Sequence, residues 1–453
     1  MHIGVSPKTL WQRRREEYLS LLRLGLPVLV TQIGIIVVSF ADTAMVGRYG
    51  VNELAASAFV NNIFMVPVVC LIGFAAGVTP LVGALFGRED YDGVGNMSKA
   101  ALQVNVVVAC ILMGIMTILY FFLDCFGQPE ELLPLIKRYY LIVLFTLIPV
   151  SVFNCLQQMC NGVTDTASPM VVMLSINCLN IVGNYLLIFG NFGFPQLGLS
   201  GAGISTLLAR VAGALAMLWL VMRSRRYGRY RRGFSDSERD CGKNRMTVLR
   251  TSFPIMVQSG VEASLWSFGA VVSGWFGKIE LASYQVTNII AQLGFMTFMS
   301  FAVATSVRVA NFCGVKDVVA MRRISVAGLH LNLVLATCAM ILFLVAGRHL
   351  IGIFTDNSEV INLCVLLIPP LILYQYGDAA QLTYANALRG TGNVSPLLWI
   401  SIVSYVVVGV SVLLLFAKGF GWGTVGIYYS FSLALFTAGV LLYLTFRRTL
   451  QRI

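Results

Sequence analysis

Charged residues are scarce in this sequence. Of its 453 residues, 11% are Asp, Glu, Lys or Arg, while 57% are hydrophobic. Soluble domains average about 25% charged residues. No soluble core could bury so much apolar surface, so this composition excludes a soluble globular protein and indicates a polytopic membrane protein.

Metal-binding and catalytic sequence patterns are also missing. The ten cysteines are scattered and include no CxxC pair. No HExxH motif occurs, and the three histidines, His2, His330 and His349, lie far apart. We therefore expect no structural metal, no cofactor and no enzymatic activity. The alternative from a different functional class is a membrane-embedded carboxylate hydrolase, which catalytic turnover without vectorial movement would reveal.

Long apolar runs are what the sequence has in abundance. Each is long enough to cross about 30 Å of hydrocarbon as a helix. They predict an all-α polytopic membrane protein with twelve transmembrane helices, near residues 19–46, 55–86, 97–123, 133–160, 169–190, 200–222, 248–275, 282–312, 324–346, 360–388, 395–417 and 421–446. The runs 55–86 and 282–312 are long enough to bend.

Basic residues are distributed unevenly between the connections. With twelve spans, both termini lie on one side, and that side carries 25 of the basic residues, ten of them between helices six and seven. Because Lys and Arg concentrate in cytoplasmic loops, we expect both termini to be cytoplasmic. The net charge of +12 mostly reflects this bias. We therefore expect the basic loop to contact anionic lipid rather than nucleic acid.

An internal repeat organises the chain. A shift of 227 residues aligns Pro27 with Pro254, and the same register holds, without a gap, over more than 140 residues. Each half contains six predicted helices, an even number, so the halves are parallel. We expect an N-terminal lobe at 1–222, a basic cytoplasmic linker at 223–247 and a C-terminal lobe at 248–453. Parallel halves with a binding site between them are a design of secondary transporters.

Four ionisable residues interrupt the apolar runs: Asp42, Glu262, Asp378 and Arg210. A charged side chain inside a bilayer costs about 2.5–3.5 kcal/mol on insertion scales, so such residues usually mark ion or substrate pathways. The alternative is that each acid is a hydrogen-bonded structural group facing another helix. We expect Arg210 to snorkel or to close a structural pair. Three acids against one arginine leave an acidic interior that suits cations.

Polar side chains accompany these acids. Asn177, Asn180 and Asn184 are spaced i, i+3 and i+7, so they share one helix face. This face either holds helices together by hydrogen bonds or lines a wet cavity. Further candidates for a substrate cavity are Gln32, Gln258, Gln285, Asn288, Gln381 and Tyr384.

Four stretches, "FADTAMVGRYG", "LGLSGAGIST", "INCLNIVGNYLLIFG" and "LYQYGDAAQLTYANALRGTG", resemble the multidrug and toxic compound extrusion (MATE) family, in its NorM-like branch. The resemblance covers nearly the whole chain. It implies two six-helix lobes, cation-driven antiport by alternating access, and export of bulky, often cationic, aromatic drugs, hence antibiotic resistance. It also implies a plasma-membrane location, the inner membrane in a bacterium. A monomer is expected.

The resemblance also implies cation-coupling residues. By position, Asp42 matches the family's helix-1 aspartate, and Asn180 and Asn184 match its helix-5 polar pair. Glu262 and Asp378 match the second-lobe acids of NorM-like members, with Tyr374 as an adjacent ligand.

The coupling ion follows from the chemistry of these residues. Carboxylate and amide oxygens suit a hard cation, so Na⁺ is favoured for Asp42, Asn180 and Asn184, with Glu262 and Asp378 as a second ion site or a proton-coupled pair. H⁺ is the alternative ion. DinF-like members have an aspartate where this chain has Asn184, so the two-carboxylate proton site of that branch is incomplete here.

A lipid-linked oligosaccharide flippase of the wider superfamily is the alternative transporter. Such a protein needs basic residues for the pyrophosphate of its substrate. The interior of this chain offers only Arg210.

Overall fold

The protein is built from helices. The computed structural model describes residues 10–126, 129–235 and 241–453, and these residues form no strand. The α-helices are α1 (Leu10–Tyr49), α2 (Val51–Ala76), α3 (Val78–Gly87), α4 (Tyr91–Tyr120), α5 (Leu133–Leu144), α6 (Leu147–Gly162), α7 (Ala167–Phe189), α8 (Leu199–Arg223), α9 (Arg231–Ser235), α10 (Cys241–Trp275), α11 (Lys278–Gly314), α12 (Val318–Gly352), α13 (Ser358–Leu366), α14 (Ile368–Gly390), α15 (Ser395–Ser401), α16 (Ser411–Leu414) and α17 (Gly423–Leu450). Short 3₁₀ segments are η1 (Leu123–Phe126), η2 (Asn191–Gly193) and η3 (Arg225–Tyr230), and π-helical segments are η4 (Ile402–Val410) and η5 (Leu415–Gly419).

The predicted membrane-spanning architecture is confirmed. Within the described ranges, eleven helical spans are long and apolar enough to cross a membrane. A twelfth consists of α13 and α14, which bend by 49° where they meet. The run 55–86 breaks between α2 and α3, whereas the run 282–312 lies within the single helix α11. The α13–α14 bend was not predicted, although Pro369 and Pro370 lie in the first turn of α14 and lack the backbone donors that a continuous helix needs.

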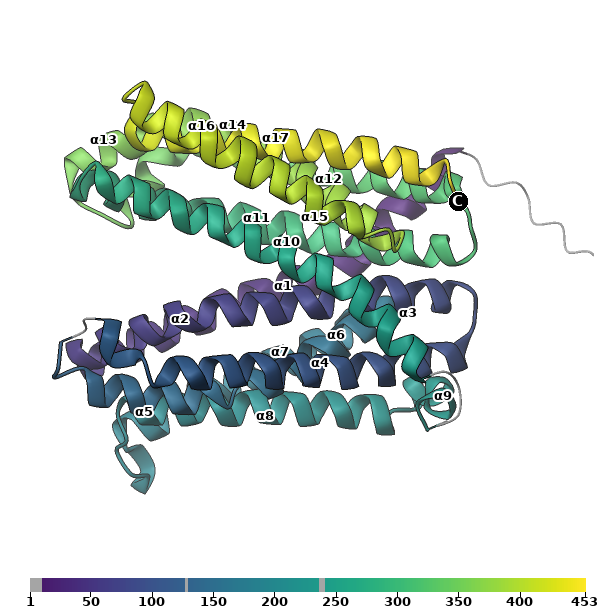
Figure 1. The fold of residues 1–453 in the computed structure, drawn as a ribbon, viewed down its shortest axis with the longest axis horizontal. Coiled ribbons are helices and arrows are strands. Elements are labelled where there is room, and N and C mark those ends of the chain that lie inside the picture. The colour runs from purple at the N-terminus through teal and green to yellow at the C-terminus, as the bar shows by residue number, and fades with distance from the viewer. Residues whose placement is uncertain (1–9, 127–128, 236–240) are drawn as a thin grey trace, which may run out of the picture. The chain divides into compact units, whose positions relative to one another are not determined.

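Two compact units make up the chain. One unit contains Met1–Leu29 and Ser264–Ile453, and the other contains Val30–Ala263. In Figure 1 the C-terminal unit includes the green and yellow helices α11 to α17, and the N-terminal unit includes the blue and teal helices α2 to α8. The division by contacts differs from the predicted lobes 1–222 and 248–453 at the starts of α1 and α10. The lobe borders read from the sequence repeat stay a prediction, and linker residues 236–240 and N-terminal residues 1–9 lie outside the described ranges.

Close packing explains why these two helix starts join the opposite unit. At the start of α1, a Cβ added to Gly25 would lie 2.5 Å from the Phe301 ring of α11. At the start of α10, Ser252 approaches the break between α2 and α3 so closely that a Cβ on Gly77 would lie 2.3 Å from its hydroxyl. The two glycines therefore allow close helix packing. The start of α1 packs within the C-terminal unit, and the start of α10 packs within the N-terminal unit.

The 227-residue repeat is visible in local structure. Asp90 caps the start of α4 by accepting a hydrogen bond from the Gly93 amide, at 2.8 Å, and Asp317 caps α12 in the same way, at 2.9 Å. The residues before these caps, Glu89 and Lys316, both have positive φ angles, 61° and 56°. The turn that joins two spans is thus built twice, at the predicted spacing.

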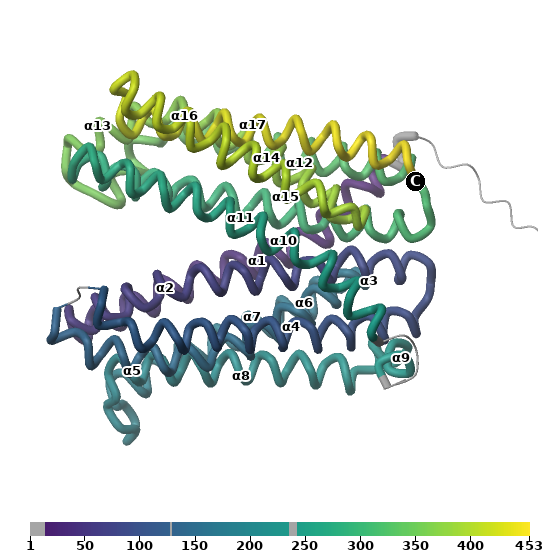
Figure 2. Tube along the Cα trace, in the orientation of Figure 1, coloured from purple at the N-terminus to yellow at the C-terminus, as the bar shows by residue number. Residues whose placement is uncertain are grey.

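Each unit has its own apolar core. In the N-terminal unit, α6 lies centrally and contacts α2, α3, α4 and α8, while α7 packs along α8. In the C-terminal unit, α14 lies centrally and packs against α17, α11 and α12. Figure 2 shows α14 and α17 side by side, with the end of α17 near the start of α12. The central helices therefore place their polar residues inside a packed unit.

Candidate functional site

Asp42 lies in a polar cluster of the N-terminal unit. Its helix, α1, passes beside α7, where Gly34 lets the two helices approach: a Cβ there would lie 3.0 Å from the Asn177 amide nitrogen. The Asn184 amide of α7 donates a hydrogen bond to Asp42 Oδ1. Asn184 is fully buried, and Asn180 is 4% exposed. The structure therefore brings together three of the residues predicted for cation coupling.

The cluster continues onto α8. Asn184 Nδ2 also lies 3.5 Å from Asn180 Oδ1, and Asn180 Nδ2 donates to the Thr206 hydroxyl at 3.2 Å. Thr206 was not predicted, because one threonine in an apolar helix carries no signal of its own. Asp42, Asn180, Asn184 and Thr206 thus converge from three helices.

The donors and acceptors of this cluster fit a hard cation. Both amides direct their nitrogens at neighbouring residues of the cluster, which leaves carbonyl, carboxylate and hydroxyl oxygens as ligands. The Asn184 Oδ1 atom is buried and has no hydrogen-bond partner among the residues that the structure describes. A buried acceptor without a partner is costly, and a cation bound there would satisfy it. Oxygen ligands of this kind are preferred by hard cations.

Arg210 lies one turn beyond Thr206 on α8. Its Nη1 donates to the Thr146 hydroxyl at 2.6 Å, and Thr146 is fully buried at the junction of α5 and α6. Its guanidinium lies close enough to Asp42 to interact with this carboxylate electrostatically. The arginine is therefore held within the unit, and it adds a fixed positive charge near the acid of the cluster.

The predicted second-lobe residues lie on α14. Tyr374 and Asp378 are four residues apart and share one helix face, and both are buried, with 7% and 1% exposure. The Tyr374 ring lies 5.4 Å from Trp266 of α10, in an edge-to-face arrangement. Trp266 in turn contacts Phe431 of α17 at 4.3 Å. Asp378 thus lies one turn from a cluster of packed aromatic rings, and this cluster was not predicted.

Glu262 belongs to the N-terminal unit, although it was predicted to act with Asp378. It lies on α10, one helical turn before Trp266, and is half-buried. Because the two acids belong to different units, their pairing stays a prediction.

The remaining predicted cavity residues are dispersed. Gln258 and Gln381 are buried and Gln32 is half-buried, whereas Gln285 and Asn288 are exposed. Tyr384 is buried, and it lines a cavity between α12, α14 and α17. Their role in binding a substrate stays a prediction.

The described part of the basic linker docks on the N-terminal unit. The Tyr227 hydroxyl of η3 donates to the buried carboxylate of Asp165 at 2.7 Å, and Arg226 pairs with the same carboxylate oxygen at 3.0 Å. Burial raises the pKa of Tyr227 well above its ordinary value. The phenol therefore stays protonated and able to donate near neutral pH. Part of the linker is thus a structural contact, which its basic composition alone did not indicate.

Comparison with protein-family profiles identifies the family to which the chain belongs. The MatE profile matches residues 27–186 and again residues 254–415. The chain belongs to the MatE family. The two matches begin 227 residues apart, which is the predicted repeat.

Curated relatives carry the name of one branch of this family. The chain is 28% identical over 440 residues to "Probable multidrug resistance protein NorM" of Rhizobium meliloti, covering 95% of this chain and 93% of the relative. It is 27% identical over 406 residues to "Multidrug resistance protein NorM" of Aliivibrio fischeri, covering 88% and 86%. The resemblance to NorM-like members is therefore confirmed over nearly the full length.

Solved structures share the fold. A eukaryotic MATE transporter superposes with a TM-score of 0.86 at 18% identity, covering 97% of this chain and 98% of the other. A multidrug resistance MATE family transporter, solved in an outward-facing conformation, gives 0.84 at 17% identity, covering 99% of each chain. The arrangement of helices in this MatE member is therefore that of MATE transporters.

Proposed function

We propose that this MatE protein is a cation-coupled antiporter that exports bulky, cationic or aromatic compounds by alternating access. The observation that carries the proposal is the cluster of Asp42, Asn180, Asn184 and Thr206, in which one buried amide oxygen lacks a partner within the described part of the chain. The names of the NorM relatives support multidrug compounds as the substrates. The distribution of basic residues supports cytoplasmic termini in a plasma membrane.

Na⁺ is the coupling ion that we propose for the first cluster. Asp42 supplies the charge, and Asn180, Asn184 and Thr206 supply neutral oxygens, which together form a hard-cation ligand set. An amide at position 184 cannot release a proton as a second carboxylate would, so the cluster favours an ion over a shared proton. H⁺ is the competing ion for the same carboxylate.

Exchange follows from reciprocal linkage. If the bound cation lowers drug affinity, bound drug must lower cation affinity by the same factor. A cation entering from outside then promotes drug release on that side, and a drug binding from the cytoplasm promotes cation release inward. The ion gradient thereby drives the drug outward.

Asp378 and Glu262, which belong to different units, are each a further coupling residue in this proposal. Asp378 is buried on α14 beside Tyr374, and Glu262 lies one turn from Trp266, which contacts Tyr374. We propose that these acids respond to Na⁺ or H⁺ in addition to Asp42.

Drug affinity measured across Na⁺ concentration tests the first cluster. Wild type and Asp42→Asn are compared in nanodiscs at fixed pH, and then across pH without Na⁺. We expect Na⁺ to weaken drug binding to wild type by about 5- to 150-fold, the usual size of coupling between sites. Asp42→Asn should retain drug binding and lose most of this response. An unchanged Na⁺ response in the variant would move coupling to Glu262 and Asp378.

A further inference from the structure

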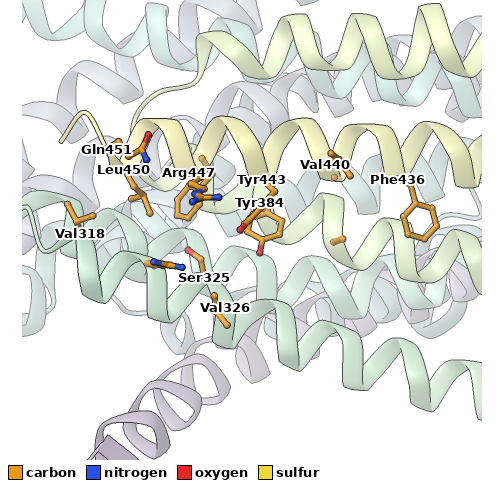
Figure 3. A pocket seen from close by; sticks show the side chains of 14 residues that line it. Val318, Ser325, Val326, Tyr384, Phe436, Val440, Tyr443, Arg447, Leu450 and Gln451 are labelled. Atoms are coloured by element: carbon orange, nitrogen blue, oxygen red, sulfur yellow. The ribbon is translucent and has the colours of Figure 1, made fainter.

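A cavity of about 560 Å³ lies within the C-terminal unit, and none of Asp42, Glu262 and Asp378 lines it. It is bordered by α12, α14 and α17, and its volume is within the range of about 300–1,000 Å³ found for small-molecule sites. Figure 3 shows side chains from these helices around it, with Tyr384 and Tyr443 close to each other. The proposed transport mechanism does not use this cavity.

The cavity is charged at one end and apolar along its length. Arg322, one turn after Val318 on α12, and Arg447 of α17 both line the cavity. Figure 3 shows Arg447 and Val318 toward the end of the cavity where Leu450 and Gln451 lie. Among the residues that the structure describes, neither arginine has an ion-pair or side-chain hydrogen-bond partner. Val440 and Phe436 line the other end, with 57% and 40% of their surfaces exposed. The cavity, which we also call the groove because its apolar end is open, thus has two arginines without ionic partners in the described ranges and an apolar stretch lined by Val440 and Phe436.

The length of the groove matches one leaflet of a bilayer. Arg447 follows Phe436 by eleven positions on α17, a rise of about 17 Å at 1.5 Å per residue. This is roughly half of the 30 Å hydrocarbon thickness. Small residues keep the floor open: Gly439 and Ala380 face each other, and a Cβ on Gly439 would lie 3.5 Å from the Ala380 side chain.

We propose that this cavity binds one anionic phospholipid, with the phosphate between Arg322 and Arg447 and an acyl chain lying along Tyr443, Val440 and Phe436. Guanidinium groups bind phosphate by charge-assisted hydrogen bonds. Basic pockets between transmembrane helices are sites for anionic headgroups. With the termini on the cytoplasmic side, the lipid comes from the inner leaflet.

Native mass spectrometry of the full chain tests the proposal. The purified protein is exchanged into an equimolar mixture of phosphatidylglycerol and phosphatidylcholine, and the lipids that it retains are counted. We expect wild type to retain one phosphatidylglycerol in preference to phosphatidylcholine. The double variant Arg322→Gln/Arg447→Gln should bind it about 10- to 30-fold more weakly, because each basic residue contributes about a factor of five. Arg448→Gln, next to Arg447 but outside the cavity, is the matched control and should behave as wild type.

A second variant tests the apolar part of the groove without changing its charge. Ala380→Leu fills the floor and keeps both arginines, so it should also lose the lipid while remaining monodisperse. Equal lipid retention by wild type and the double variant, or by wild type and Ala380→Leu, would overturn the proposal. Absence of any preference in wild type would overturn it as well. Displacement of the lipid by added tetraphenylphosphonium would assign the groove to cationic compounds instead.

Discussion

At the scale of single residues, the hydrogen-bonding direction of one amide decides what the first cluster can do. Asn184 directs its nitrogen at Asp42, and its buried oxygen has no partner among the residues described. A carboxylate at this position would present two oxygens and could share a proton with Asp42. The difference between an amide and an acid at position 184 is therefore a difference in ion preference.

Asn184→Asp should shift the coupling towards protons. The variant places a second carboxylate beside Asp42, and two such groups at close range cannot both ionise easily. Drug affinity should then depend more steeply on pH between about 5 and 8 in the absence of Na⁺, with drug binding weaker at the acidic end, where the pair is protonated. Drug titrations over this pH range check the prediction, with Asn177→Asp as the control on the same helix. A pH dependence identical to wild type would contradict the assigned role of Asn184.

Arg210→Gln should tighten Na⁺ binding. The guanidinium interacts with Asp42, so it competes for the carboxylate charge with any bound cation. Removing that charge should lower the Na⁺ concentration for half-maximal drug release several-fold. Arg210→Lys keeps the charge and should remain close to wild type. Weaker Na⁺ binding in Arg210→Gln would show that the arginine shapes the cluster rather than opposing the ion.

At the scale of elements, α14 combines a backbone bend with a buried acid. Its first residues include Pro369 and Pro370, and Asp378 follows more than two turns later in a buried stretch. The bend could have been read from the proline pair, because proline removes a backbone donor and restricts the residue before it. The cluster of aromatic rings around Tyr374 could not have been predicted from the sequence, because the rings come from four helices that meet only in the folded unit.

Asp378→Asn should weaken cation-dependent drug release and spare folding. The substitution keeps the size of the side chain and removes its charge from the middle of a buried helix. The response to Na⁺ should fall but remain measurable, because Asp42 is intact. The measurement is drug affinity with and without Na⁺, with Glu359→Gln as a control that removes an exposed carboxylate from α13, the other half of the same bent span. A full wild-type response would make Asp378 a structural group.

The linker segment η3 should contribute to stability and not to drug binding. Tyr227→Phe removes one of the donors to the buried carboxylate of Asp165, which Ser168 and Arg226 also contact, and losing a hydrogen bond to a charged group costs about 1.5–3 kcal/mol. The unfolding temperature in detergent should fall by about 2–4 °C for each kcal/mol lost. Arg226→Gln should cost less, because this side chain is 65% exposed and its ion pair is screened by solvent. Exposed Arg225→Gln is the neutral control, and reduced drug affinity in Tyr227→Phe would place η3 in the substrate path.

At the scale of the whole molecule, the sequence specified the parts that depend on local pattern. Twelve apolar runs, the 227-residue repeat and the spacing of Asn180 and Asn184 were sufficient to predict the helices and to bring these residues to one face. Thr206 was missed because hydroxyls in apolar helices usually bond to their own backbone. The assignment of the start of α1 to the C-terminal unit, and of the start of α10 to the N-terminal unit, was not predicted. It depends on close contacts such as that of Gly25 with Phe301.

Transport in proteoliposomes with independently set Na⁺ and H⁺ gradients tests the central claim most directly. The movement of a fluorescent lipophilic cation is followed for wild type, Asp42→Asn and Asp378→Asn. We expect a Na⁺ gradient alone to drive the cation against its own gradient in wild type, and each variant to reduce the rate at least about tenfold, equivalent to 1.4 kcal/mol. A wild-type rate that is the same with both ion gradients collapsed would contradict cation-coupled export.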